Sequence, residues 1–482
     1  MFETSVWMAI LPEILLLALG LIVLFYDLTS TQEEKHYMGW LTAGGLAAIL
    51  ITALAVARPG TQPQALWGGM IRHDWLGFVF QMLFIFGAAI TSLFAIDNPD
   101  LGKRGEFYLL LLASTLGMNL MASAGDLIML YLAIETTSIP LYVLAGFLTR
   151  DEKSTESGFK YLLYGTMASV TMVYGFSLLY GFSGTTNINE LASIVVQGKI
   201  GIAPLVGSLL LIMVGFGFKV SAVPFHFWAP DVYEGAPTPV AGFLSTASKA
   251  AGFAVLVRFL MTIFPAPATM PYWTSVVAIM SVATMTLGNS LALAQKNIKR
   301  LLAYSSIAHA GYLLIGLVVV SNLGITAIVF DLAAYLITNL AAFVVVATFW
   351  RVVGSDDISA YAGLSRRAPG LSLVLMVAIL SLAGMPPLGG FVGKLFLFAA
   401  AVQANYVWLA IVGVLNSIIG LYYYMTVLKV VYLYRSDDED KPLPVTRPYA
   451  IALGVCTLGI ILIGTVFAPW FSWATSAAAA LF

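Results

Sequence analysis

The chain has 482 residues, of which 60% are hydrophobic and only 10% are charged, and its formal net charge is −1. A soluble domain of this composition would aggregate, so the sequence predicts an all-α protein that crosses a membrane many times. The small net charge and the lack of a long basic stretch exclude nucleic acid as a partner and leave the lipid bilayer as the surroundings.

Apolar segments long enough to cross a bilayer, which takes about 20 residues each, recur along the whole chain. The first contains LPEILLLALGLIVLF and lacks a basic leader and a cleavage motif, so we expect a retained helix and not a signal peptide. The expected spans, about fourteen in all, are 6–27, 37–57, 75–96, 107–123, 125–148, 160–182, 203–223, 239–263, 273–294, 305–320, 325–350, 371–402, 407–433 and 449–470.

The Lys and Arg residues of the loops support this number of spans, because short cytoplasmic loops collect positive charge. Loops after even-numbered spans contain only Arg58, Arg72 and Lys199. Loops after odd-numbered spans contain Lys35, Lys103, Arg104, Arg150, Lys153, Lys160, Lys296, Lys299, Arg300, Arg351, Arg366, Arg367, Arg435, Lys441 and Arg447. The asymmetry predicts fourteen spans with both termini on the outer side.

Five basic residues fall inside the expected spans. A lysine at mid-membrane costs about 2.5–3.5 kcal/mol on insertion scales, so it is retained only where it faces a hydrated or paired interior. Lys219, Lys249 and Lys394 lie at mid-span, and three such lysines favour a functional site over structural ion pairs. Arg258 and Lys429 lie nearer the span ends, where we expect their charged groups to reach the membrane surface.

Glu135 is the acid that lies clearly at the centre of a span. A buried carboxyl or lysine favours its neutral form when alone, whereas the two together favour the charged forms, so such a pair switches protonation when its geometry changes. We therefore expect Glu135 to pair with Lys219. Asp126, Glu13 and Asp331 lie closer to span ends and are predicted to be interfacial acids.

Two spans contain helix-breaking residues close to a mid-span lysine. Proline removes a backbone donor and clashes with the preceding turn, and irregular backbone at membrane depth is tolerated only where it is buried or lines a wet cavity. A plain turn between two helices explains the first region nearly as well. The residues concerned are Pro224, Pro230, Pro237 and Pro239 after Lys219, and Pro386, Pro387, Gly389 and Gly390 before Lys394.

The few residues that ligate metals argue against a redox centre in this chain. Cys456 is the single cysteine, and the four histidines are far apart in sequence, so an iron–sulfur cluster cannot be held. His309 lies well inside its expected span, where a neutral imidazole could relay protons or simply pack. With Glu135 and the three lysines it could form a polar line at mid-membrane depth, conducting protons only if waters bridge the gaps.

Four motifs carry a resemblance that covers essentially the whole chain. They are LPEILLL at 11–17, HFWAPDVYEGAPTPV at 226–240, QKNIKRLLAYSSIAHAGY at 295–312 and GMPPLGGFVGK at 384–394. Together they resemble the antiporter-like membrane subunits of respiratory complex I, the proton-pumping NADH:quinone oxidoreductase, and among these the N-type subunits. The WAPDVYEGAP loop and a lysine at position 394 distinguish this type from its L- and M-type sisters.

The resemblance implies fourteen helices with two inverted five-helix repeats and broken helices 7 and 12. It divides the chain into N-terminal helices 1–3 (residues 1–106), a first repeat of helices 4–8 (107–263), a second repeat of helices 9–13 (264–435) and a C-terminal loop and helix 14 (436–482). The family's translocation residues fall on Glu135, Lys219, Lys249 and Lys394.

The implied activity is that of a non-redox subunit of a translocase, in which quinone reduction elsewhere drives protons through these four residues and His309. The chain itself would hold no cofactor. NADH or a related donor, FMN, iron–sulfur clusters and quinone would be bound by partner subunits, and the membrane partners would be an M-type subunit and the small K-, J- and A-type subunits. The implied location is a bacterial inner membrane rather than a thylakoid or organelle membrane.

Two other functions fit the same features. A cation/proton antiporter without redox coupling would also keep buried lysines, and it would exchange sodium for protons without dehydrogenase partners. A purely structural membrane subunit would use the buried charges only to pair with neighbouring residues.

Overall fold

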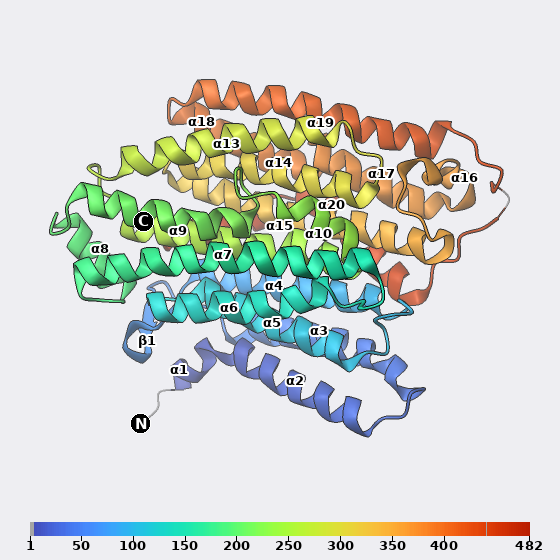
Figure 1. Ribbon diagram of the computed structural model, residues 1–482, viewed down its shortest axis with the longest axis horizontal. Coiled ribbons are helices and arrows are strands. Elements are labelled where there is room, and N and C mark those ends of the chain that lie inside the picture. Colours follow the sequence, from blue (N-terminus) through green and yellow to red (C-terminus); the bar gives the residue numbers. More distant parts are fainter. Residues whose placement is uncertain (1–3, 440) are drawn as a thin grey trace.

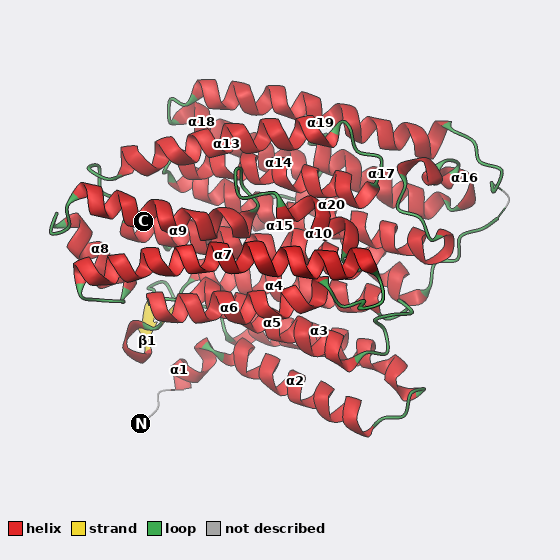
Figure 2. Cartoon of the chain, in the orientation of Figure 1, coloured by secondary structure: helices red, strands yellow, loops and turns green. Residues whose placement is uncertain are grey.

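The computed structural model describes residues 4–439 and 441–482, and these fold almost entirely into helices that run alongside one another (Figure 1). Figure 2 shows strand only in one small hairpin at an end of the bundle. The α-helices are α1 (Thr4–Ala9), α2 (Leu11–Thr29), α3 (Met38–Val56), α4 (Trp75–Ala95), α5 (Gly105–Ser123), α6 (Leu127–Ala145), α7 (Glu152–Ser183), α8 (Ile188–Val196), α9 (Ile202–Val220), α10 (Trp228–Gly235), α11 (Thr238–Phe243), α12 (Lys249–Ile263), α13 (Met270–Ala292), α14 (Ile298–Val318), α15 (Asn322–Val353), α16 (Leu364–Arg367), α17 (Pro369–Ala383), α18 (Gly389–Gln403), α19 (Val407–Leu433), α20 (Arg447–Thr465) and α21 (Ala468–Ala479). The remaining elements are the strands β1 (Gln64–Leu66) and β2 (Ile71–His73), the 3-10 helices η1 (Glu34–Tyr37), η2 (Trp67–Gly69) and η4 (Ile358–Tyr361), and a π-helical turn, η3 (Leu244–Ser248).

The described residues contain the fourteen expected spans. Thirteen helices are long and apolar enough to cross a membrane, and they include the continuous segment Thr238–Ile263 made of α11, η3 and α12. The fourteenth span is divided into the two shorter apolar helices α17 and α18. The expected span 305–320 is longer than its apolar pattern indicated, because α14 begins at Ile298 and includes two basic residues in its first turn.

Helix boundaries follow local capping chemistry. Asp126 and Asn297 stand immediately before α6 and α14, and their side chains accept hydrogen bonds from backbone N–H groups of the first turn. At the other ends, α7 and α15 stop at Gly184 and Gly354, whose φ values of 75° and 70° suit glycine. These caps fix where α6 and α14 begin and where the two 32-residue helices α7 and α15 end.

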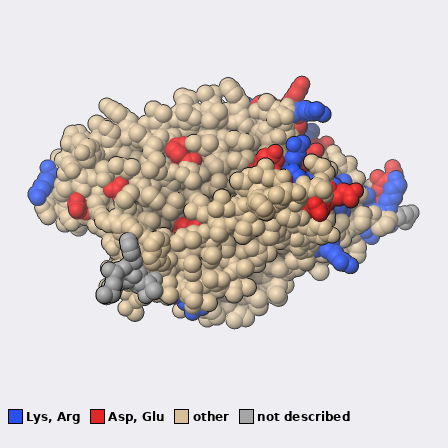
Figure 3. Space-filling model, turned by 90° about the horizontal axis from the view of Figure 1, so that it is seen from below, with Lys and Arg blue, Asp and Glu red and all other residues tan. Residues whose placement is uncertain are grey.

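Loops alternate between the two ends of the bundle as the charge pattern predicts. At one end, a cavity is lined by residues from five connections that follow odd-numbered spans, among them Asn98, Asp151, Ala236, Asn297 and Asp356. Figure 3 shows Lys, Arg, Asp and Glu side chains gathered at this end, and far fewer at the opposite one.

The opposite end joins the connections that follow even-numbered spans. Ile71 of the β1–β2 hairpin forms a bridge with Ala124, and Asp126 forms one with Asn187. The C-terminal segment meets the same hairpin, since Arg72 donates a hydrogen bond to the Ala480 carbonyl at 2.8 Å. Figure 1 places α1 and the C-terminal end of the chain on this side, so the even number of spans is confirmed.

Three elements at this end lie outside the expected pattern of spans: the hairpin, the short helix α8 and the C-terminal helix α21. α21 packs against α15 and α4. The spans that contain Lys249 and His309 are among the most deeply buried. The most apolar part of Thr238–Ile263 is wholly buried within the protein and that of α15 is 89% buried, whereas only 28% of that of α2 is buried.

Both predicted helix breaks are confirmed. α9 ends at Ser221, whose φ of 59° is left-handed, and the chain is irregular until α10 begins at Trp228. α17 ends at Gly384 with a φ of 82°, and α18 resumes at Gly389. A further irregularity was not predicted: the π-helical turn η3 lies immediately before Lys249. Such turns leave backbone carbonyls without their usual partners and occur frequently at functional sites.

Candidate functional site

Glu135 and Lys219 face one small cavity between α6, α7 and α9. Lys219 Nζ donates to Ser138 Oγ at 2.5 Å, and Ser169 donates a hydrogen bond to the half-buried Glu135. Ser138 follows Glu135 by three residues and therefore lies on the same face of α6. The expected direct Glu135–Lys219 ion pair is absent from the described residues. Glu135 and Lys219 instead line the same space of about 10 Å³, roughly the room for one water.

Lys249 is the most deeply buried of the three lysines, with 1% of its surface exposed. Its ammonium group donates to the backbone carbonyl of Ser306 at 2.5 Å and to the hydroxyl of the same serine. Among the described residues no carboxylate lies within ion-pair distance of Lys249. Gly252, one turn further along α12, packs against Lys219, since a Cβ at this glycine would stand 3.2 Å from the Cβ of Lys219.

His309 lies one turn after Ser306 on α14 and is buried. Its Nε2 atom lies 2.9 Å from an oxygen of Asp331 on α15. The imidazole stacks on the Tyr335 ring with a centroid distance of 4.1 Å and an interplanar angle of 17°. His309 therefore joins the Lys249 region to a carboxyl group on the neighbouring helix.

The prediction that Asp331 is an interfacial acid is wrong, because none of its surface is exposed. α15 extends three residues further at its start than the apolar pattern indicated, which moves Asp331 to the tenth position of a buried helix. A signal was present in the sequence: Asp331 is the only charged residue between positions 323 and 350. Its isolation within a long apolar run marks it as a buried acid.

Lys394 lies one turn into α18, beyond the second helix break. Its ammonium group donates to the Leu382 carbonyl at 2.9 Å, and it lies 4.9 Å from the centre of the Tyr312 ring in a cation–π contact. The break supplies this acceptor, because carbonyls in the last turn of α17 have no partner further along the helix. Gly384 leaves space for the lysine, since a Cβ there would stand 3.1 Å from Lys394 Cδ.

Arg258 lies near the hairpin end of the bundle as expected, but it is buried among protein groups there and not exposed at the surface. Its guanidinium binds both oxygens of Asp74 at 2.7 Å and donates to the Ala122 carbonyl at 3.0 Å. Arg72 also contacts Asp74 at 2.8 Å. Burial alone would raise the pKa of the Asp74 carboxyl, but the charges and hydrogen bonds of Arg258 and Arg72 hold that pKa below its usual value. This cluster fastens the β2 strand to α4, α5 and α12.

For three other charged residues, the structure contradicts one prediction and agrees with two. Glu13 is not interfacial, because it is buried and accepts a hydrogen bond from Gln81 on α4 at 2.8 Å. Asp126 caps α6 and is partly exposed, as expected of an interfacial acid. Lys429 is exposed and lies 5.6 Å from the Tyr434 ring beyond the end of α19, as expected of a residue that reaches the surface.

Ion pairs hold α10, the second half of the broken seventh span, at the charged end of the bundle. Asp231 contacts Lys160 at 2.6 Å and Arg300 at 2.7 Å, while Glu234 contacts Lys153 at 3.1 Å and the same arginine at 3.0 Å. These bonds come from α7 and α14, the helices on either side. The acids of the WAPDVYEGAP motif therefore fix the position of α10.

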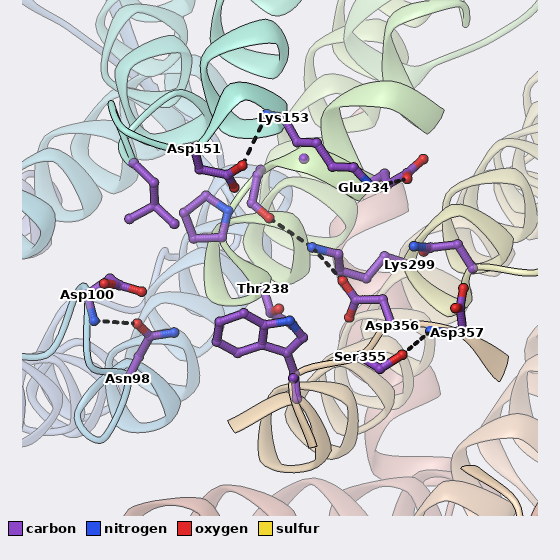
Figure 4. Close-up of a pocket in the computed structure, with 17 residues that line it drawn as sticks. Asn98, Asp100, Asp151, Lys153, Glu234, Thr238, Lys299, Ser355, Asp356 and Asp357 are labelled. Carbon is purple, nitrogen blue, oxygen red and sulfur yellow. Dashed lines mark hydrogen bonds and ion pairs between the residues drawn. The ribbon is translucent and has the colours of Figure 1, made fainter. Parts of the chain in front are cut away.

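The cavity at this end has a volume of about 320 Å³ and lies beside α10. Figure 4 shows Lys299 facing Asp356 there, with Thr238 nearby. Lys299 Nζ lies 3.3 Å from an oxygen of Asp356 and donates to the Ala236 carbonyl at 3.2 Å. Lys299 is buried, although its basic neighbours lie close to a loop. It therefore places a buried cation beside the cavity, close to the start of the span that contains Lys249.

The five candidate residues follow one another through the centre of the protein. Glu135 and Lys219 share a cavity, Lys219 packs near Lys249, and Lys249 reaches the turn of α14 that precedes His309. Lys394 lies on α18, which packs against both α14 and α15. Within residues 4–439 and 441–482, no group of three or more His, Cys, Asp or Glu side chains is placed to hold a metal ion. The arrangement suits the storage and transfer of protons.

Comparisons with known proteins identify the family. A family model described as "NADH:quinone oxidoreductase/Mrp antiporter, TM" matches residues 124–420. NADH-quinone oxidoreductase subunit N of Moorella thermoacetica is 42% identical over 472 residues, which cover 98% of each chain. The protein of the same name from Dehalococcoides mccartyi is 40% identical over 469 residues, covering 95% of this chain and 96% of the relative.

Solved structures agree with these relatives. A chain of respiratory complex I from Thermus thermophilus with bound Aureothin is 32% identical, with a TM-score of 0.81 over 96% of this chain and 98% of that one. A chain of the Mrp complex from a Dietzia species has a TM-score of 0.88 at 20% identity, covering 100% of this chain and 98% of that one, and therefore shows the common fold alone. The chain belongs to the NADH:quinone oxidoreductase/Mrp antiporter family of membrane proteins, and within it to the subunit N group.

Proposed function

We propose that this chain is a proton-translocating membrane subunit of a NADH (or related donor):quinone oxidoreductase, in which it couples quinone reduction to proton pumping without carrying electrons itself. The observation that carries the proposal is the series of ionisable groups at the half-buried Glu135 and at the buried Lys219, Lys249, His309 and Lys394. Keeping each mid-membrane lysine costs about 2.5–3.5 kcal/mol on insertion scales, and this cost is expected to persist only where the charge has a use.

Lys249 is the central proton-releasing group in this proposal. Its ammonium is held by a hydroxyl and a carbonyl of Ser306, and no carboxylate among the described residues stabilises its charge. A small change in the field at Lys219, whose helix packs against α12, is therefore expected to displace the proton on Lys249. Moving one charge against 100 mV costs about 2.3 kcal/mol, and a change of about two units in proton affinity supplies about 2.7 kcal/mol.

The helix breaks explain how the field at Lys219 and Lys394 could change. Each lysine lies within about a turn of an irregular segment, so a small rotation of α9 or α18 would alter the contacts of Lys219 with Ser138 or of Lys394 with Leu382. We further propose that residues 107–263 and 264–435 are two inverted repeats, with residues 1–106 and 436–482 as additions. Each repeat would then contain one broken helix and one of these lysines.

Partner chains would supply the redox chemistry. We propose that NADH or a related donor, FMN, iron–sulfur clusters and quinone are bound by those chains, and that the M-type and the small K-, J- and A-type membrane subunits flank this one. We propose that the end formed by the loops after odd-numbered spans, with the cavity of Figure 4, faces the cytoplasm at a bacterial inner membrane, because these loops contain most of the positive charge. Both termini would then lie outside.

Purification of the tagged chain from its own membranes tests the proposal. We expect it to bring down chains that hold FMN and iron–sulfur clusters, and vesicles with this complex to acidify when NADH or another donor is oxidised. Isolation with membrane subunits only, together with sodium-dependent proton exchange in vesicles that lack a dehydrogenase, would instead establish a cation/proton antiporter. A structural role would be indicated if Lys219→Ala left an assembled complex with unchanged pumping.

A further inference from the structure

Asp331 is the only acidic residue in the α-helices of residues 264–435, which are α13 to α19. None of its surface is exposed. An ionised carboxylate taken out of water loses several kcal/mol of hydration, which must be offset by a nearby positive charge or avoided by protonation. Asp331 is therefore either protonated itself or paired with a neighbouring group that is protonated and positively charged.

The contacts of Asp331 come from two other helices. His309 on α14 lies 2.9 Å away, and apart from this contact neither carboxylate oxygen forms a hydrogen bond within the described part of the chain. On the other side, the backbone of Gly393 on α18 packs directly against the carboxylate, so that a Cβ at this glycine would collide with it. The residue after this glycine is Lys394, so the acid lies between the histidine and the segment that contains the second lysine.

The surrounding charges favour a carboxyl group that changes its protonation. Lys249 on α12 binds Ser306, which lies one turn of α14 before His309, and Lys394 follows the glycine that contacts Asp331. A proton on His309 would be repelled by both lysines, and among the residues that the structure describes it would be attracted by Asp331 alone. The charges of the two lysines therefore determine whether the proton of this region lies on the His309 imidazole or on the Asp331 carboxyl group.

We propose that Asp331 is a further proton-accepting residue of the translocation line, which exchanges a proton with His309 between Lys249 and Lys394. The inference rests on the proposed pumping function and gives the second repeat an acid of its own, as Glu135 does for the first. In the step itself, the N–H bond at His309 Nε2 breaks as an O–H bond forms at Asp331, leaving a neutral imidazole and a neutral carboxyl group. The reverse transfer restores the ion pair.

Asp331→Asn in the complete purified complex is the first test, because asparagine keeps the size of the side chain and cannot take up a proton. We expect normal assembly and a fall in pumping of about tenfold or more, since positioned acid–base groups contribute about 10²–10⁴-fold. Thr338→Val, two turns along the same helix, is the matched control, because Thr338 is equally buried and only bonds Ala334 and Ser381. We expect this control to pump normally.

An infrared difference spectrum between resting and turning-over complex gives a readout that a structural role would not change. We expect a carboxyl C=O band that is absent from Asp331→Asn and shifted in Asp331→Glu. If the asparagine variant does not assemble, the glutamate variant tests the inference instead: a shifted carboxyl band supports it, and the absence of a shifted band overturns it. Normal pumping by Asp331→Asn, or a spectrum in which neither variant alters any carboxyl band, would overturn the inference. The pumping proposal fails separately, if Lys249→Met also pumps normally.

Discussion

The cluster of Asp74, Arg258 and Arg72 allows a quantitative prediction about stability. Asp74 accepts two hydrogen bonds from Arg258 at 2.7 Å, one contact from Arg72 at 2.8 Å and the N-cap hydrogen bond from Gly77 at 2.8 Å. Replacing Asp74 by alanine strands two guanidinium groups, of which that of Arg258 is buried. Removing one partner of a buried ion pair costs about 3–5 kcal/mol, and losing an N-cap costs about 1 kcal/mol.

Removal of Arg258 is expected to cost less than removal of Asp74, because Arg258→Met leaves Asp74 with Arg72 as a partner. The double variant Asp74→Leu with Arg258→Met is expected to recover all but about 1 kcal/mol of the loss, since only the cap is then missing. Arg72 has 18% of its side chain exposed and can turn toward water. Each variant thus has a distinct place in the predicted order of stability.

The assay is the free energy of unfolding in lipid–detergent bicelles, measured by denaturant titration with the helix content as signal. Lys441→Ala is the control, because its ion pair with Asp438 is exposed and its loss is expected to change nothing measurable. The reasoning is refuted if Asp74→Ala is no less stable than Arg258→Met, or if the double variant is less stable than both. Either result would mean that the buried charges do not depend on one another.

Three further predictions follow from single contacts. The pKa of Asp74 is lowered in the folded protein, so the ion-pair stabilisation is present above the unfolded pKa of about 3.9 and is lost as pH falls through the lower folded value. The difference in stability between wild type and Asp74→Asn should therefore disappear only in that acid range. A difference that disappears near neutral pH would contradict the assignment. Gly384→Ala should lose about 1–2 kcal/mol of unfolding free energy because its φ is 82°, and unchanged stability together with unchanged pumping would show that the break does not constrain Lys394. Ser138→Ala removes the hydrogen-bond partner of Lys219 and should cost about 1–3 kcal/mol, measured in the same titration, whereas a neutral effect would indicate that water already solvates the lysine.

The spans and their breaks were predictable because both depend on local sequence. Each crossing needs about 20 apolar residues, and the prolines around Pro224 and Pro386 interrupt helices wherever the rest of the fold lies. The hairpin and α21 escaped prediction since neither is long enough to carry a spanning pattern.

Partners of the buried charges were harder to predict, because they come from residues far apart in sequence. Arg258 was expected at the membrane surface, but Asp74, 184 residues earlier, binds it inside. Asp331 was assigned to a span end through an error of a few residues in the start of α15. The expected contact between Glu135 and Lys219 missed the two serines that these residues bind instead, Ser169 and Ser138, since apolar periodicity says nothing about side-chain hydroxyls.

Proton pumping by an assembled complex with Lys249→Met tests the central claim most directly. Methionine fills the space of the lysine stem and removes only the charge and its proton, so assembly should be preserved. The account predicts that the rate of acidification per assembled complex falls about tenfold or more, while a Lys429→Met complex, altered at an exposed lysine, pumps like wild type. A fully assembled Lys249→Met complex that moves as many protons per donor oxidised, at the same rate as wild type, would contradict it.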